Sequence, residues 1–173
     1  MENNLHRDLD IFEAYIETPE KYEWYKKVFA SYDVNGVEKF SLNWSWFSFF
    51  FAPIHLAYRK CYIEALLIWI VQFVFSPSGV MSSIIFSIGC AVISPWLIYK
   101  RYRRTVDNIA FSGNDRETKI EMAKKLGGVD KLARNIAIVL QFFVIFIVIC
   151  QFLILLGFNL FFFNFMTPFI FIY

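Results

Sequence analysis

From Asn135 to Tyr173 the chain runs for 39 residues without a single Asp, Glu, Lys or Arg. A second run, from Cys61 to Tyr99, carries Glu64 as its only charge. Apolar runs of this length are typical of helices that cross a bilayer, which need about 20 residues each. The sequence therefore predicts an all-α integral membrane protein with about three transmembrane helices. Its 58% hydrophobic content agrees with this prediction.

The charged and apolar blocks divide the chain into six predicted segments. They are a short cytosolic helical head (1–42), an interfacial or re-entrant aromatic helix (43–56), a transmembrane hairpin (57–99), a basic cytosolic loop with a short amphipathic helix (100–134), a third transmembrane helix (135–157) and an apolar, Phe-rich tail (158–173). As one helix, the uncharged stretch from Asn135 onward would measure about 58 Å, which exceeds a hydrocarbon core of about 30 Å. The chain is therefore predicted to turn near Gly157–Asn159 and again near Pro168.

The aromatic segment is too short to cross a membrane by itself. From Trp44 to Leu56 it would form about 20 Å of helix, and Pro53 removes one backbone donor inside it. Trp44 and Trp46 suit the headgroup boundary, where amphipathic rings are favoured. For His55 the pattern favours a packing role over a metal or catalytic role. Tyr58, Arg59 and Lys60 follow, and we expect them to anchor the start of the first transmembrane helix at the headgroups.

The predicted hairpin contains a few polar side chains. Glu64 lies one turn after Lys60, which suggests an interfacial ion pair or, alternatively, a proton relay or cation site. Gln72 lies deeper and is expected to bond to a neighbouring helix. A row of small side chains lies on nearly one face of the second helix of the hairpin, and it suggests a packing face or, alternatively, a polar pore lining. This row comprises Ser83, Ser87, Ala91 and Ser94.

The charge distribution predicts the orientation. Residues 1–43 carry a net charge of −4, and residues 100–134 carry +5. The basic cluster directly after the hairpin comprises Lys100, Arg101, Arg103 and Arg104. Basic loops stay in the cytoplasm, so we expect a cytoplasmic N-terminus, an outward turn at 76–79 and contact between the basic cluster and acidic headgroups rather than nucleic acid.

Residues 41–67, SLNWSWFSFFFAPIHLAYRKCYIEALL, resemble the hallmark of a family of small bacterial membrane proteins known only as domain of unknown function 2628. The matching positions are Trp44, Phe49–Phe51, Pro53, Tyr58, Arg59, Lys60 and Tyr62. Ala52 stands where the family usually has glycine, and His55 where it often has tryptophan. The resemblance covers roughly residues 15–130 and implies a multi-pass protein of the bacterial inner membrane. It implies no activity, because none is known for the family.

No motif for enzymatic chemistry is present. The chain has no HExxH, GxSxG, P-loop or paired-carboxylate motif, and its three cysteines are far apart. We therefore expect no enzyme activity and no cofactor. The sequence favours an accessory or scaffold protein that packs against lipid, a membrane protein partner or a second copy of itself. The alternative is a subunit of a small oligomeric transporter or channel, with Glu64, Gln72 and the serines along a polar path.

Overall fold

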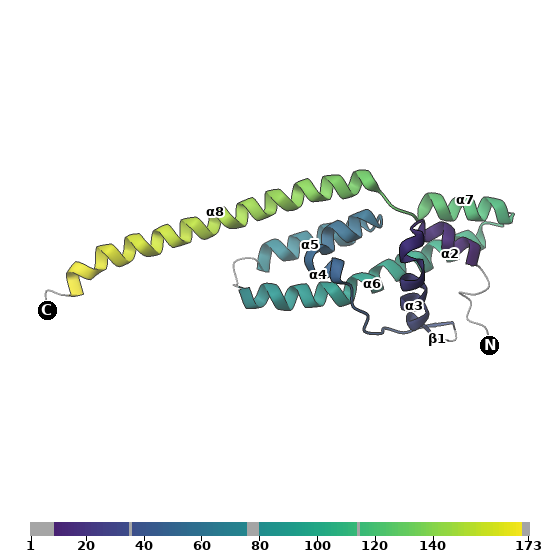
Figure 1. The fold of residues 1–173 in the computed structure, drawn as a ribbon, viewed down its shortest axis with the longest axis horizontal. Helices are drawn as coiled ribbons and strands as arrows, with labels where there is room; N and C mark the ends of the chain where they lie inside the picture. Colours follow the sequence, from purple (N-terminus) through teal and green to yellow (C-terminus); the bar gives the residue numbers. More distant parts are fainter. Residues whose placement is uncertain (1–8, 35, 76–79, 114, 171–173) are drawn as a thin grey trace. The chain divides into compact units, whose positions relative to one another are not determined.

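The computed structural model describes residues 9–34, 36–75, 80–113 and 115–170. The protein is mostly helical, as predicted (Figure 1). Its elements are α2 (Leu9–Ile16), the 3-10 helix η1 (Pro19–Lys21), α3 (Tyr22–Tyr32), a two-stranded antiparallel hairpin of β1 (Asp33–Val34) and β2 (Val37–Glu38), α4 (Trp46–Tyr58), α5 (Tyr62–Phe75), α6 (Val80–Phe111), α7 (Arg116–Leu126) and α8 (Lys131–Ile170). The predicted outward turn at 76–79 lies outside the described residues. The chain forms two compact units, Met1–Ala137 and Ile138–Tyr173.

The head packs on the second half of α6, where α2, α3 and α7 gather (Figure 1). Aromatic rings form its core: Phe12 contacts Phe29 at 5.8 Å and Tyr102 at 5.6 Å between ring centroids, and Phe29 contacts Tyr99 at 5.4 Å. Offset and edge-on pairs of this kind contribute about 0.5–1.5 kcal/mol each beyond the area they bury. The C-terminal half of α6 is therefore the platform of the head.

This arrangement differs from the cytosolic loop that we predicted to begin at residue 100. Helix α6 continues without interruption to Phe111, because Tyr102, Thr105 and Ile109 recur at helical spacing and are buried. Because basic residues lie between these three positions, the charge pattern alone did not predict this buried face. Further along, α7 ends at Leu126, just before the Gly127-Gly128 pair, and glycine commonly follows the last residue of a helix.

Two segments are long and apolar enough to cross a membrane, Met81–Phe111 and Arg116–Ile154. The apolar helix Tyr62–Val74 falls short of that length. At 14 residues, α5 measures about 21 Å, against a hydrocarbon core of about 30 Å. The structure thus supports two helices of membrane length where the sequence predicted three.

Helix α8 continues through both positions at which the sequence predicted a turn, near Gly157–Asn159 and near Pro168. It runs over 40 residues to Ile170, which is about 60 Å at the usual rise per residue. A single glycine such as Gly157 costs a helix only about 1 kcal/mol relative to alanine, and the neighbouring Leu residues favour helix. In the second compact unit of the chain, large apolar side chains of α8 are exposed, including Phe142, Phe146 and Phe152.

Candidate functional site

Helix α4 begins against the middle of α6. Pro95 has no N–H, so the carbonyl of Ala91, four residues earlier, lacks its usual helical partner. The backbone N–H of Ser45 donates to that carbonyl at 3.1 Å, and the Ser45 hydroxyl accepts from the N–H of Ser48 as the N-cap of α4. One proline in α6 thus creates the acceptor that holds the start of α4.

Helix α4 has two unlike halves, separated by a kink. Phe51 has non-helical angles, φ −138° and ψ 44°, because the ring of Pro53 conflicts with a regular helix in the preceding turn. Before the kink, Trp46 and Phe50 are exposed. After it, the side chains from Ala52 to Ala57 are buried. Pro53 thus marks the change from an exposed to a buried part of the helix.

A buried polar network crosses from α4 to the head at His55. Its Nδ1 lies 2.6 Å from the Ser48 hydroxyl, and its Nε2 lies 3.2 Å from the Tyr25 hydroxyl of α3. A neutral imidazole donates through one nitrogen and accepts through the other, so both contacts suit the uncharged ring. Burial, followed by the charges of Arg59 and Lys21, lowers the pKa of His55 to about 3. Ser48 is fully buried, so this Ser–His pair is closed to a substrate.

His55 makes stability depend on pH. The pKa of His55 is about 6.5 in the unfolded chain and about 3 in the folded one, so between these values the unfolded chain binds a proton that the folded chain does not. The contacts of the neutral ring therefore stabilise the fold fully above pH 6.5 and progressively less as the pH drops toward 3. At about 1.4 kcal/mol per pH unit, we expect a loss of about 2 kcal/mol at pH 5. Thermal unfolding at pH 7.5 and 5 would measure it, with His55→Gln as the control. Equal pH dependence in both proteins would contradict this assignment.

Arg59 ties the end of α4 to the head. Its guanidinium donates to the carbonyl of Ile16 and to the hydroxyl of Thr18, both at 2.8 Å, and it lies 4.5 Å from the ring centroid of Tyr25. Only 5% of Arg59 is exposed. The predicted anchoring of Arg59 at the headgroups does not match this position, because both terminal nitrogens of the guanidinium donate to groups inside the protein.

The residues beside Arg59 bond to the segment that joins α7 and α8. Tyr58 accepts the N–H of Asp130 at 2.8 Å, and the Lys60 ammonium donates to the Lys125 carbonyl at 2.9 Å. The hydroxyl of Tyr62 donates to the Asp130 carboxylate at 2.7 Å. Asp130 also caps α8 through the N–H of Ala133. We call the residues 15–18, 58–62 and 125–130 the junction.

The predicted pair between Lys60 and Glu64 does not form. Lys60 has a φ of 62° and lies outside α5, so it does not share a helix with Glu64, and its ammonium contacts α7 instead. Glu64 and Gln72 are both half-buried on α5. Of the small residues predicted to form a packing face on α6, Ala91 and Ser94 are buried, Ser87 is half-buried and Ser83 is exposed.

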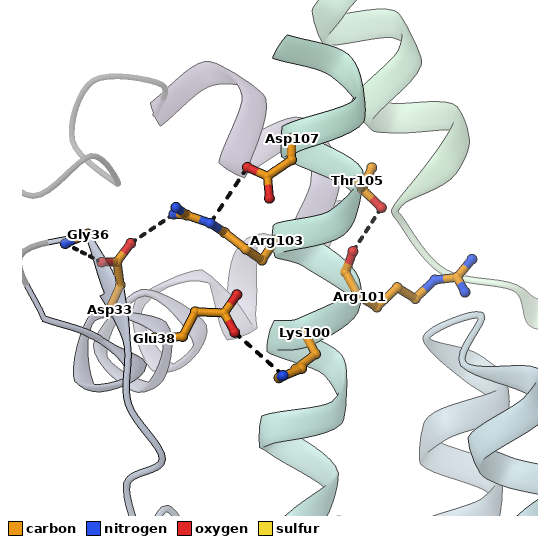
Figure 2. A network of polar contacts seen from close by, with 8 residues as sticks. All are labelled: Asp33, Gly36, Glu38, Lys100, Arg101, Arg103, Thr105 and Asp107. Carbon is orange, nitrogen blue, oxygen red and sulfur yellow. Dashed lines mark hydrogen bonds and ion pairs between the residues drawn. The ribbon is translucent and has the colours of Figure 1, made fainter. Parts of the chain in front are cut away.

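The basic cluster divides into paired and unpaired side chains (Figure 2). Arg103 pairs with Asp33 at 3.1 Å and with Asp107 at 3.6 Å, and Lys100 pairs with Glu38 at 3.5 Å. The ion pairs of Asp33 and Glu38 hold the β1–β2 hairpin against α6, whereas Asp107 lies on α6 itself. The structure therefore directs two of the four cations predicted to face headgroups toward the head itself.

The sequence pointed to Tyr58, Arg59, Lys60 and Tyr62 but missed their partners. Ser48 and His55 are seven residues apart, two helical turns, in an otherwise apolar segment, and Arg59 follows His55 by one turn. This spacing was a signal that a polar face runs along α4. Tyr25, Ile16 and Thr18 gave no such signal, because they lie far away in the sequence.

Among the described residues, no group of three or more His, Cys, Asp or Glu side chains is placed to hold a metal ion. No family model, curated protein or solved structure matches this chain. The resemblance to domain of unknown function 2628 thus stays a prediction from the residues that carry it.

Proposed function

We propose that this protein is a non-enzymatic accessory or scaffold protein of the bacterial inner membrane, in which a cytoplasmic head is held rigidly on membrane-embedded helices. The observation that carries the proposal is the junction. Within one turn of chain, Tyr58, Arg59 and Lys60 bond to the end of α2, the end of α7 and the start of α8. Such ties fix the orientation of one part on another, which a scaffold needs and which requires no reactive group.

The exposed surface supports the membrane placement. Helix α5 exposes Ile63, Leu66 and Ile70, and the first half of α6 exposes Met81 and Ile85. Soluble proteins rarely expose apolar surface this extensively. Together with the two helices of membrane length, this surface suits acyl chains, while the paired charges and the small hairpin of the head suit water.

The start of α4 supports the re-entrant alternative for the aromatic segment. Ser45 bonds to Ala91, which lies nine residues before Lys100 on α6, or about 14 Å along the helix. A backbone that enters lipid needs protein partners for its polar groups, and the Ala91 carbonyl supplies one. We infer that the chain dips to about half the depth of the bilayer at Trp44–Trp46 and returns to the cytoplasmic side at Tyr58.

Tryptophan fluorescence would measure this depth. In a variant that retains Trp46 as its only tryptophan, lipids brominated in the middle of the acyl chain should quench fluorescence more strongly than lipids brominated near the headgroup, because the N-terminus of α4 lies beside the middle of the apolar part of α6. The matched control retains only Trp24, which lies on α3 of the head and should show little quenching by either lipid. Equal weak quenching of both variants would contradict the membrane placement.

The transporter alternative is distinguished by a second measurement. Glu64 and Gln72 lie eight residues apart on α5 and are the half-buried polar side chains that a path would use. We expect liposomes that contain the purified protein to conduct cations no faster than empty liposomes. Flux above that background, reduced by Glu64→Gln, would replace the scaffold proposal with the transporter alternative.

A further inference from the structure

Arg101 is a half-buried cation for which the described part of the protein provides no acceptor. Its Nε is enclosed and donates to no atom, and no carboxylate among the described residues lies within ion-pair distance. Its neighbours Lys100 and Arg103 each have an acidic partner. Buried polar groups without a partner are rare in native proteins, and each of them calls for an explanation.

The side chain of Arg101 leaves α6 on the side opposite to Arg103, away from the carboxylates of the head (Figure 2). Its charge acts on Tyr15 of α2 and on Cys61 and Tyr62 at the start of α5, and it opposes the rise in the pKa of Tyr15 that burial causes. The carboxylate of Asp130, which contacts Tyr62, already accepts from the Tyr62 hydroxyl and from the N–H of Ala133. The guanidinium of Arg101 thus points away from the carboxylates that pair with Lys100 and Arg103.

We propose that Arg101 binds the phosphate group of an anionic phospholipid at the cytoplasmic end of α5 and α6. A guanidinium presents two parallel N–H donors that match two phosphate oxygens. The exposed apolar side chains of Ile63, Leu66 and Leu67 follow Tyr62 on α5 and offer a surface for the acyl chains. The positive end of the α5 helix dipole, at Tyr62, adds to the attraction. This inference rests on the proposed membrane placement.

The test uses the purified full-length protein in detergent micelles, to which phosphatidylglycerol, phosphatidylcholine or inorganic phosphate is added. Thermal unfolding and native mass spectrometry would report stabilisation and bound lipid. We expect phosphatidylglycerol to stabilise the wild type more than either other addition, and Arg101→Gln to weaken its binding about tenfold or more, as loss of a charge-assisted contact predicts. Arg101→Lys, which keeps the charge but not the fork, should bind with intermediate affinity.

Arg104→Gln is the matched control, because Arg104 lies on the same helix and is exposed. Its affinity for phosphatidylglycerol should equal that of the wild type. Unchanged affinity in Arg101→Gln, or an equal loss in Arg104→Gln, would overturn the site. Full stabilisation by inorganic phosphate alone would overturn the lipid as its ligand. Binding of phosphatidylglycerol to the protein in micelles does not depend on the depth of α4 in a bilayer. The tryptophan quenching can therefore contradict the proposed depth while the lipid binding at Arg101 is still found.

Discussion

Replacing Arg59 with methionine should lower the free energy of unfolding by about 3 kcal/mol, because the substitution leaves the buried carbonyl of Ile16 without its charged donor and removes the contact with the Tyr25 ring. Methionine keeps much of the side-chain length, so the loss reflects the polar contacts more than a cavity. Thermal and denaturant unfolding of the purified protein in detergent would measure it. We also expect the head to become more accessible to protease, since Arg59 joins it to α4.

Arg59→Lys tests whether the planar guanidinium matters as well as the charge. An ammonium cannot reach the Ile16 carbonyl and the Thr18 hydroxyl with the same fork, so we expect a loss of about 1–2 kcal/mol. An anchor at the headgroups, as the sequence suggested, would tolerate this change. Arg104→Lys is the control and should be neutral, because Arg104 is exposed. A neutral Arg59→Lys variant would show that the buried ties do not form in solution.

Gly127→Ala should destabilise the junction by about 3 kcal/mol. A methyl group at Gly127 would overlap the Tyr15 ring and would lie 2.7 Å from the carbonyl oxygen of Ala123, and a backbone atom cannot move aside as a flexible side chain can. At the neighbouring Gly128 a side chain is disfavoured by the φ of +69° and by the nearby Glu17 carboxylate. Unfolding measurements on Gly127→Ala would report the loss directly.

Gly89→Ala is the matched control for these glycines. Gly89 lies within α6, and an added methyl group there meets no atom within 4 Å. Alanine favours a helix over glycine by up to about 1 kcal/mol, so this variant should be as stable as the wild type or slightly more stable. If Gly127→Ala were equally harmless, the close approach of α2 to the α7–α8 segment would be wrong.

Much of the helical structure was readable from the sequence, because a helix depends on residues near one another in the chain. The apolar runs predicted α5, the part of α8 from Asn135 to Gly157 and the first half of α6. Each of these signals is local, since helical hydrogen bonds join residues four apart. The residues Tyr58, Arg59 and Lys60 were also singled out, on a local pattern, but with a role at the headgroups.

Only the tertiary structure decided what these residues contact. The Ile16 carbonyl, the Tyr25 ring and the Lys125 carbonyl lie 34 to 65 residues from their partners Arg59 and Lys60, and no period in the sequence relates them. The same holds for Ser45, whose N–H donates to the Ala91 carbonyl that has no helical partner because of Pro95. Hydrophobic patterning determines which segments are helices. The partners of a buried cation, or of a carbonyl that lacks its helical donor, depend on which surfaces meet when the helices pack.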